Sequence, residues 1–467
     1  MVAYNYIFAF LLLALFITIG EGKNVLFMPV DDLRPEMLEA YDQKYIHTPN
    51  LDRLAKESFV FQRAYCQHAV CIPSRNSFMT GRRPDTTHVW IGFGNANFRV
   101  TGPDWISLPE HFKKNGYTTL GGGKTFHPNS PPNWDEPKSW SQDQPYFPFS
   151  LAKCPNTTTA HKLGAYVADI DTWCPLDEKE YPDSYHYDWQ LANHTIHTLK
   201  YLKDKGGPWF VAPEPIPIEI QQSIRHAYYA SVSWVDSQIG RVLQALDDMS
   251  LADDTLVVLF GDHGFQLGEH DSWAKMTNWE LAVRVPLIIR APWKPASAGK
   301  RSHAFVELVD LYRTISELVG APSPGDDIEG VSFASLFDSP DLNAHEAALA
   351  LNKTPAAYSQ YTRCLKSIDA PKQWDNNSCS ETSKNKFMGY SVRVPNWRYT
   401  AWMEWDDSRL KAKWESEPYA VELYDHHKSD GADGTENDFN QCEIENVADK
   451  NPEVVKELQN QLKSFFN

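Results

Sequence analysis

The chain has 467 residues, of which 42% are hydrophobic and 22% charged. This composition is typical of a globular protein with a large core and room for two domains. Its formal net charge of −17 argues against broad binding to nucleic acid or to another polyanion. An anionic substrate would therefore need positive charge concentrated in a pocket.

A short apolar run opens the chain, from Phe8 to Ile19, and Gly20-Glu21-Gly22 follows it. The run is too short and too close to the start for a membrane span, and it is typical of a secretory signal peptide cleaved near Gly20 or Gly22. We expect residues 1–22 to be this signal peptide, with a retained N-terminal anchor as the alternative. Because no second apolar span follows, we expect no stable membrane span after cleavage.

The first strand is expected over Asn24–Val30, an apolar run typical of a buried strand in a parallel sheet. Pro29 cannot donate to a ladder, so we expect a local bulge or a position whose donor would face away from the neighbouring strand. Asp31 and Asp32 follow directly, and carboxylates at the carboxyl end of a strand indicate a ligand site in an open α/β sheet. A solvated Asp-Asp turn is the alternative. A helix is expected to open at Thr48–Ala55.

A second short helix is expected to begin at Cys71. Pro73 is favourable in a first helical turn, where an amide donor would lack a partner, and Gly81 can end the helix. The Cys71 side chain would then face the positive end of the helix, with Arg75 one turn on. Such a position suits an anion and an activated nucleophile, whereas a lone cysteine is more often simply buried or disulfide-bonded.

A strand at Tyr117–Leu120 runs into the three glycines 121–123, and Lys124 and His127 follow. A P-loop is excluded because that motif needs glycine at the position of Thr118. The glycines would instead let the backbone approach a bound group closely, with Lys124 and His127 aimed at it. A flexible turn with two solvated side chains is the alternative.

The rest of the first domain predicts a second acidic strand end. The strand expected over Thr255–Phe260 runs into Asp262 and His263, with Lys275 beyond. In a doubly wound sheet this end can lie beside Asp31 and Asp32, although the two are far apart in the sequence. The other expected elements of this part are a long irregular excursion over residues 129–190, a strand at 209–212, a long helix at 218–249, a strand at 286–290 and a helix that opens at 305–311.

The character of the sequence changes after about residue 340. Short strands at 390–394, 397–402 and 420–424 suggest an antiparallel sheet, and the amphipathic pattern at 452–466 predicts a closing helix. We therefore expect a large α/β domain over residues 23–340, which would carry the site, and a smaller C-terminal domain over residues 341–467.

The run Cys71-Ile72-Pro73-Ser74-Arg75, followed by Thr80-Gly81-Arg82-Arg83-Pro84, resembles the signature of the type I sulfatases. The longer run Arg82–Thr87 is most similar to the iduronate 2-sulfatase branch of that family. The resemblance implies an alkaline-phosphatase-like fold, in which a mixed, mostly parallel sheet is flanked by helices and joined to a smaller antiparallel-sheet-plus-helix domain. It also implies that a formylglycine-generating enzyme oxidises Cys71 to Cα-formylglycine.

Hydrolysis of a sulfate ester needs a nucleophile, a cation, positive charge on the non-bridging oxygens and an acid for the leaving alcohol. Hard carboxylate oxygens come from Asp31, Asp32 and Asp262, which suit Ca²⁺ and, as a second choice, Mg²⁺. The cationic residues near these motifs are Arg75, Lys124 and Lys275, and a candidate proton shuttle is His127.

The resemblance assigns these residues more closely. It implies that Ca²⁺ is bound by Asp31, Asp32, residue 71, Asp262 and His263, of which the histidine is chemically unusual because calcium prefers oxygen. It also implies that Arg75 and Lys124 hold the formylglycine, that Lys275 binds the sulfate and assists the leaving group, and that His127 draws a proton from the second hydroxyl to expel sulfate.

The substrate implied is a sulfated glycosaminoglycan sugar, with the 2-O-sulfate of a terminal iduronate in heparan or dermatan sulfate as the first choice. A sulfatase for another sulfated substrate is the alternative enzyme. The family's His-Lys-Pro-His loop has no counterpart at Pro213–Pro217, where Glu214 would repel sulfate. Either another histidine such as His270 replaces it, or the chain is a catalytically weak homologue that binds sulfated glycans.

A secretory route permits disulfide bonds and glycosylation. Local bridges are plausible between Cys154 and Cys174 and between Cys364 and Cys379, which leaves Cys66 and Cys442 unassigned once Cys71 is converted. Glycosylation sequons begin at Asn156, Asn193, Asn352 and Asn376. The sequence leaves open whether the destination is the lysosome or the extracellular space.

Overall fold

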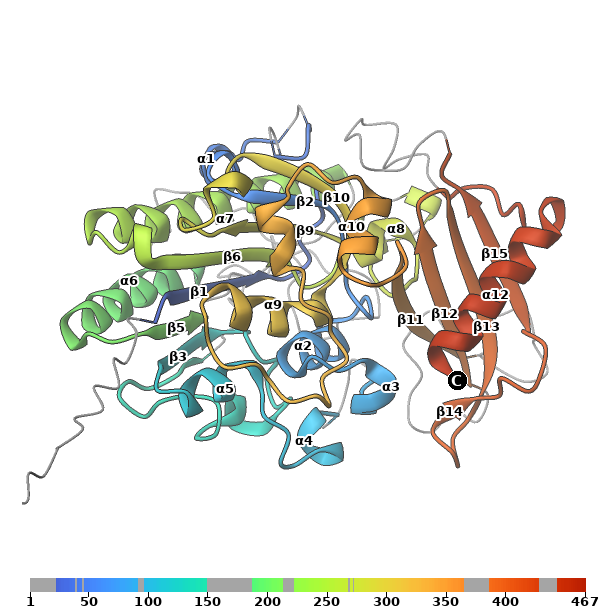
Figure 1. Cartoon of the computed structure of the whole chain (residues 1–467), viewed down its shortest axis with the longest axis horizontal. Coiled ribbons are helices and arrows are strands. Elements are labelled where there is room, and N and C mark those ends of the chain that lie inside the picture. Colours follow the sequence, from blue (N-terminus) through green and yellow to red (C-terminus); the bar gives the residue numbers. More distant parts are fainter. Residues whose placement is uncertain are drawn as a thin grey trace, which may run out of the picture.

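The computed structural model describes residues 22–37, 40–43, 46–90, 96–148, 187–212, 222–267, 269–271, 273–364, 386–427 and 443–467. They form two units that lie side by side in Figure 1, a large α/β unit and a smaller antiparallel sheet covered by a helix. No helix in these ranges is long and apolar enough to cross a membrane.

The large unit is built on an eight-stranded sheet with the order β10-β2-β9-β6-β1-β5-β3-β4. Its strands are β1 (Asn24–Val30), β2 (Phe59–Tyr65), β3 (Thr118–Gly123), β4 (Phe147–Pro148), β5 (Trp209–Ala212), β6 (Thr255–Gly261), β9 (Arg284–Arg290) and β10 (Lys300–Glu307). All neighbouring strands pair in parallel except β9, which runs antiparallel to both β6 and β2. The mostly parallel sheet expected from the sequence is therefore confirmed.

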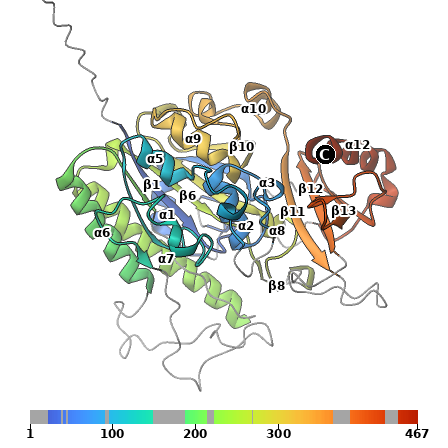
Figure 2. The same cartoon turned by 90° about the horizontal axis from the view of Figure 1, so that it is seen from below.

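Both faces of this sheet are buried, as the continuous apolar runs of its central strands predict. Along β1, Val25 and Phe27 belong to one core cluster, whereas Leu26 and Met28 belong to the other. Figure 2 shows the helices of the two layers on opposite sides of the sheet. One layer contains α1 (Pro49–Lys56), α6 (Tyr187–Lys205) and α7 (Gln222–Asp248), and the other α2 (Cys71–Thr80), α5 (Leu108–Lys114) and α9 (Leu311–Leu318).

The smaller unit is a five-stranded sheet in which every pairing is antiparallel. Its strands are β11 (Ala357–Cys364), β12 (Lys386–Val394), β13 (Trp397–Asp406), β14 (Lys411–Ala412) and β15 (Ala420–Asp425). The closing helix α12 (Pro452–Phe466) packs on this sheet through Leu458 and Leu462, as its amphipathic pattern predicts.

One expectation about the large unit needs correction, and of the two alternatives expected at Pro29 the structure excludes the bulge. Phe305–Glu307 does not open a helix, because these residues continue β10 and pair with β2, and the α-helix begins only at Leu311. No bulge forms at Pro29, because the register between β1 and β6 is continuous through it. β5 pairs with β1 only at Val25 and Leu26, so the missing donor of Pro29 interrupts no ladder on that side.

The transition between the units comes later in the chain than residue 340. Helix α10 (Ala344–Ala350) still packs on the large unit, since Ala347 belongs to the same core cluster as Phe305. The second sheet begins at Ala357.

Candidate active site

The acidic ends of β1 and β6 meet, as the sequence predicts. Val30 pairs with Gly261 at the last position of the two strands, so Asp31 and Asp262 leave the sheet side by side. The chain then turns sharply at Asp32, whose φ of 57° lies in the left-handed region. The turn is held by the Asp262 carboxylate, whose Oδ1 accepts hydrogen bonds from the backbone amides of Asp32 at 3.1 Å and His263 at 2.9 Å.

Helix α2 presents Cys71 to these carboxylates from its first turn, as expected. The helix ends at Gly81 in the left-handed conformation with φ 64°, where a Cβ would come within 2.4 Å of Ile328. Arg75, one turn into the helix, is fully buried and donates to Asp262 Oδ2 and to the carbonyl of Lys124, both at 2.7 Å. This arginine therefore ties the helix to both the β6 and the β3 strand ends.

Four side chains from four different parts of the chain surround the sulfur of Cys71. The distances from Sγ are 3.2 Å to Asp31 Oδ1, 3.2 Å to Lys275 Nζ, 3.3 Å to Lys124 Nζ and 3.3 Å to His263 Nε2. The two lysines also pair with the aspartates: Lys124 with Asp31, and Lys275 with Asp32 at 2.6 Å. The residue at position 71 thus occupies the centre of the site.

Lys275 is held by strained backbone. It follows the two-stranded ribbon of β7 (Gln266–Leu267) and β8 (Trp273–Ala274). Its neighbours Ala274 and Met276 have φ of 67° and 83°, a left-handed conformation that costs on the order of 1–3 kcal/mol per residue. The Met276 amide donates to the Ala69 carbonyl at 3.2 Å, which fixes this loop to the segment that leads into Cys71.

The buried carboxylates of the site lie close together, and the pKa values of Asp31 and Asp32 shift in opposite directions. Burial alone would raise the pKa of Asp31, but Lys124, Lys275 and Arg75 together hold it well below its ordinary value. Burial raises the pKa of Asp32 to about 6, and the nearby carboxylates of Asp31 and Asp262 add to the rise against the effect of Lys275. A bound cation would relieve this crowding of carboxylates.

The thiol of Cys71 is a poor nucleophile in this setting. Burial and then the charge of Asp31 raise its pKa to about 11, despite the two lysines. Because the thiolate is the reactive form of cysteine, the activation expected from the helix N-terminus alone is not achieved. An unmodified Cys71 thiol therefore gives no chemical reason for the two lysines, the aspartate and the histidine that surround position 71.

His127 lies close to the cationic side of the site. Its Nδ1 lies 3.2 Å from the Pro128 carbonyl. Burial and then the charge of Lys124 lower its pKa to about 3, so its imidazole is neutral and can accept a proton. His127 thus has the protonation state that a general base requires.

One group of side chains has the geometry of a metal site. The ligand atoms of Asp31, Cys71, Asp262 and His263 all lie within 4.8 Å of one another. Asp32 stands next to them, with Oδ1 at 3.2 Å from His263 Nδ1. Burial lowers the pKa of His263, which keeps the imidazole neutral. A set rich in carboxylate oxygens fits a hard divalent cation.

Two residues that support the site, Ser74 and Tyr228, were not predicted from the sequence. Ser74 Oγ donates to the Asp262 carbonyl, and Tyr228 OH donates to the Asp32 carbonyl at 2.8 Å while accepting from the Arg34 amide at 3.0 Å. Ser74 belongs to the cysteine motif and could have been inferred from it. Tyr228 lies in the middle of α7 and carries no local signal that distinguishes it from a core tyrosine.

The modification sites stand in contrasting surroundings. Asn352 is exposed in a turn with φ 51°, whereas Asn193 lies half-buried within α6, where its Oδ1 accepts from Arg241 at 3.3 Å. Cys66 is a buried free thiol. The other predicted positions, which are Asn156, Asn376, Cys154, Cys174, Cys379, Cys442, the side chain of Cys364 and the segment Pro213–Pro217, lie outside the described residues.

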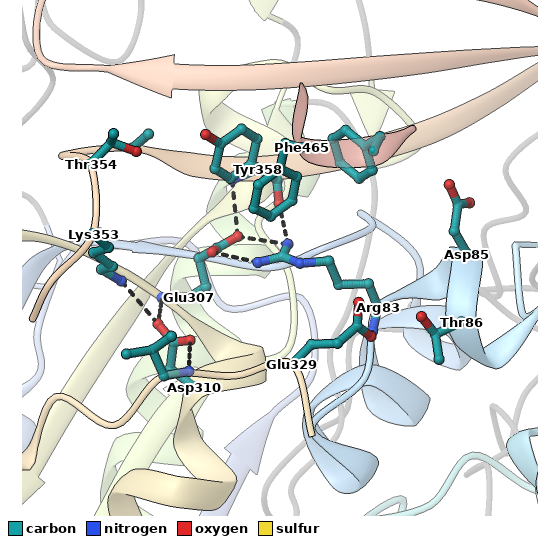
Figure 3. A pocket seen from close by; sticks show the side chains of 13 residues that line it. Arg83, Asp85, Thr86, Glu307, Asp310, Glu329, Lys353, Thr354, Tyr358 and Phe465 are labelled. Carbon is teal, nitrogen blue, oxygen red and sulfur yellow. Dashed lines mark hydrogen bonds and ion pairs between the residues drawn. The ribbon is translucent and has the colours of Figure 1, made fainter. Parts of the chain in front are cut away.

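A separate cavity of about 480 Å³ lies where the two units join (Figure 3). Its charges are paired by the protein itself. Arg83 donates to both carboxylate oxygens of Glu307, at 2.9 and 2.7 Å, and Lys353 donates to Asp310 at 3.3 Å. Arg83 also donates to the Tyr358 carbonyl of β11 at 3.4 Å, so this arginine joins the two units, whereas the candidate catalytic residues gather around Cys71.

Comparisons with known proteins agree with this geometry. The sulfatase family model matches residues 23–321. The chain is 34% identical to iduronate 2-sulfatase of Mus musculus over 508 aligned residues, and 34% identical to that of Homo sapiens over 501, covering 86% of this chain and 89% of the relative in both cases. Among solved structures, the fold is similar to a 2-O GAG sulfatase (TM-score 0.66, 18% identity, 95% and 92% of the two chains covered). It is also similar to a phosphonate monoester hydrolase of Agrobacterium radiobacter (TM-score 0.67, 17% identity, 95% of each chain).

Proposed function

Because this chain belongs to the sulfatase family and is a hydrolase of sulfate esters, we propose that it removes the 2-O-sulfate from a terminal iduronate of heparan or dermatan sulfate. The observation that carries the proposal is the position of residue 71. Its side chain is surrounded by two lysines, an aspartate and a histidine within 3.3 Å. This arrangement provides both a cation site and a cationic wall for an anionic group.

We infer that position 71 carries a formylglycine in the mature protein. The Cys71 sulfur marks the place of the hydrated aldehyde, which would supply a hydroxyl nucleophile that the protonated thiol does not. The residues that contact the sulfur are then the residues that would hold the hydrate: Lys124 and Lys275 by donating hydrogen bonds, and Asp31 by accepting one. Maturation requires a formylglycine-generating enzyme as a partner.

We infer that a calcium ion completes the site, held by Asp31, Asp32, Asp262, His263 and residue 71. A bound calcium ion would supply positive charge to the nucleophile and to the sulfate oxygens. Arg75 positions Asp262 for this role through its 2.7 Å hydrogen bond. Magnesium is the second choice, because it demands stricter octahedral geometry than this mixed set of neighbours offers.

The remaining groups have distinct roles in the proposal. Lys275 binds the sulfate and assists the leaving alcohol, whereas Arg75 and Lys124 hold the formylglycine. His127, which burial keeps neutral, accepts a proton from the nucleophile's second hydroxyl. The missing His-Lys-Pro-His loop leaves one sulfate contact to be supplied by another residue, for which His270 is the candidate, because it lies near the start of the segment that carries Lys275.

The choice of iduronate is supported by the relatives, two of which are named iduronate 2-sulfatase and align over most of this chain. An acidic protein whose lysines gather around one residue also fits a substrate that enters by one terminal sugar. The apolar N-terminal run and the exposed sequon at Asn352 support passage through the secretory pathway, with the lysosome as the expected destination and secretion as the alternative.

The test is to express the chain with a formylglycine-generating enzyme and to confirm the aldehyde at position 71 by mass spectrometry. The protein is then offered a 2-sulfated iduronate glycoside, a 6-sulfated hexosamine and an aryl sulfate. We expect the fastest sulfate release from the iduronate. Preference for another compound would assign the chain to another substrate, and binding without release would identify a weak homologue that binds sulfated glycans.

A further inference from the structure

Strand β11 of the smaller unit runs beside the loop that leads into Cys71. In Figure 2 this strand is the edge of the second sheet that faces the large unit. Three successive contacts join strand and loop: Ser359 Oγ donates to the Cys66 carbonyl at 2.7 Å, the Gln360 amide donates to the Gln67 carbonyl at 2.9 Å, and the Tyr361 ring lies 5.0 Å from the His68 ring. β11 therefore runs alongside the loop that leads into Cys71.

The loop that carries Lys275 also contacts the smaller unit close to Tyr361. Asn278 Nδ2 donates to the Gly389 carbonyl at 2.8 Å, and Gly389 is the partner of Tyr361 in the β11–β12 ladder. Tyr361 is thus bracketed by the loop before Cys71 and by the loop after Lys275. Two residues further along β11, on the same face as Tyr361 because strand side chains alternate, comes Arg363.

Arg363 differs from the other arginines at this junction. Its guanidinium carbon lies 5.0 Å from the centroid of the Tyr361 ring, and the residue is half-buried. Within the described chain no carboxylate forms an ion pair with it, whereas the junction arginines with carboxylate partners are Arg83, Arg393 and Arg398. His68, beneath Tyr361, adds no second positive charge, because burial lowers its pKa to about 3 and leaves it neutral.

We propose that Arg363 binds the carboxylate of the sulfated uronic acid, and so selects this sugar over neutral sulfated sugars. The inference rests on the proposed function. A guanidinium held against an aromatic ring keeps its fork rigid, and that fork matches a carboxylate with two parallel hydrogen bonds. A 2-sulfated uronic acid carries its carboxylate on the same ring as the sulfate, and Arg363 stands on the strand that runs beside the loop into Cys71.

The experiment compares one sugar with and without its negative carboxylate. Arg363→Gln and the wild type are given a 2-sulfated iduronate glycoside and its methyl ester, in which the carboxylate is neutral. We expect the wild type to prefer the acid. In the variant, KM for the acid should rise about 10-fold to 100-fold, as for loss of a charge-assisted hydrogen bond. The kcat for the acid and the KM for the methyl ester should be nearly unchanged.

Two variants control the comparison. Arg363→Lys keeps the charge but loses the fork, so its KM for the acid should fall between the two. Arg409→Gln removes an exposed arginine from the same unit, where Arg409 pairs with Asp406 and Glu415, and should leave both KM values unchanged. Thermal unfolding of each variant checks that the fold is intact.

The outcomes separate this inference from the proposed function. A wild type that hydrolyses neither compound would overturn the proposed function and this inference with it. A wild type that hydrolyses both equally well would overturn only the role of Arg363. Equal losses on acid and ester in Arg363→Gln would show that the arginine supports the loop rather than the substrate, which also overturns the proposal.

Discussion

Two buried clusters in this protein contain the same kinds of residue but behave differently. Asp31, Cys71, Asp262 and His263 lie at the strand ends of the large sheet, and a second group consists of Glu280, His426 and Glu443 at the junction between the units. In each group the potential ligand atoms lie within 4.8 Å of one another. By proximity alone, both would be candidate metal sites.

The junction cluster neutralises its own charge. Glu280, in the short helix α8 (Glu280–Val283), accepts from Tyr65 OH at 2.9 Å, from Arg393 at 3.2 Å and from Arg398. Glu443 accepts from Arg398 at 2.6 Å, from His426 at 3.0 Å and from the Glu280 amide at 2.6 Å. Every carboxylate oxygen therefore has a donor, and a cation would have to displace one.

The active site also pairs its aspartates with three cations, Lys124, Lys275 and Arg75, but its carboxylates titrate differently. Its three aspartates lie around one residue, and burial raises the pKa of Asp32 to about 6. At Glu280, in contrast, the charges of Arg393 and Arg398 outweigh burial and hold the pKa below its ordinary value. The difference shows how to separate a functional charge cluster from a structural one. In the junction cluster every carboxylate oxygen already has a donor, whereas in our proposal the active-site cluster is completed by a bound cation.

The largest expected effect is on turnover when the central residue is removed. Cys71→Ala should lower turnover at least about 10⁴-fold, because no nucleophile remains. Cys66→Ala is the matched control, since Cys66 is a buried free thiol near Cys71 in sequence, and it should keep its activity. Kinetics with a sulfated iduronate glycoside measures both. Undiminished turnover in Cys71→Ala would refute the role of residue 71.

The next largest expected effect is on the free energy of unfolding when the junction cluster is disrupted. Arg398→Met removes the cation that Glu280 and Glu443 share, so the free energy of unfolding should fall by about 3–5 kcal/mol. Chemical denaturation measures the change. The surviving folded protein should retain a KM near that of the wild type, because Arg398 does not contact the active-site groups. A stability close to that of the wild type would show that the junction network is not needed to hold the units together.

Calcium should distinguish the two clusters directly. At a concentration about 100-fold above its dissociation constant, a ligand bound only by the folded state stabilises it by about 2.7 kcal/mol. We expect this shift in the wild type and in Glu443→Gln, but not in Asp262→Asn. Differential scanning calorimetry with calcium and with chelator makes the measurement. A calcium response lost in Glu443→Gln and kept in Asp262→Asn would reverse the assignment of the two clusters.

Much of the fold and site follows from local sequence. The strand ends at Asp31 and Asp262 can be predicted because each follows a continuous apolar run. The bounds of α2 can be predicted because Pro73 lies in its first turn and Gly81 ends it. The sheet then places the two ends together at one edge. The candidate site residues therefore converge for a topological reason that the sequence pattern already contains.

The missed elements are those whose burial depends on distant partners. β2 contains Gln62 and Arg63 within a fully buried strand, and β10 begins with charged residues, so neither shows a clean strand pattern. Arg63 is accommodated because it donates to the His303 carbonyl of β10 at 3.1 Å. Nor did any local signal connect Glu280 with Arg398 and Glu443, which the fold brings together from separate segments.

The smallest effect tests the junction cluster by pH, with calcium held constant. Burial would raise the pKa of Glu443, but Arg398 and His426 outweigh it and hold the pKa below the ordinary value of 4.5. Since the folded state binds the proton less readily than the unfolded chain, the stability from this carboxylate is present above about pH 4.5 and is lost as pH falls through the lower folded pKa.

Glu443→Gln removes this titration and the charge of the side chain. The gap in unfolding free energy between wild type and variant should therefore stay constant from about pH 7 to pH 5 and shrink at lower pH. Denaturation curves at matched pH values measure the gap. A gap that widens as pH falls would mean that the proton stabilises the junction cluster, and the contrast with the active site, where burial raises the pKa of Asp32, would then fail.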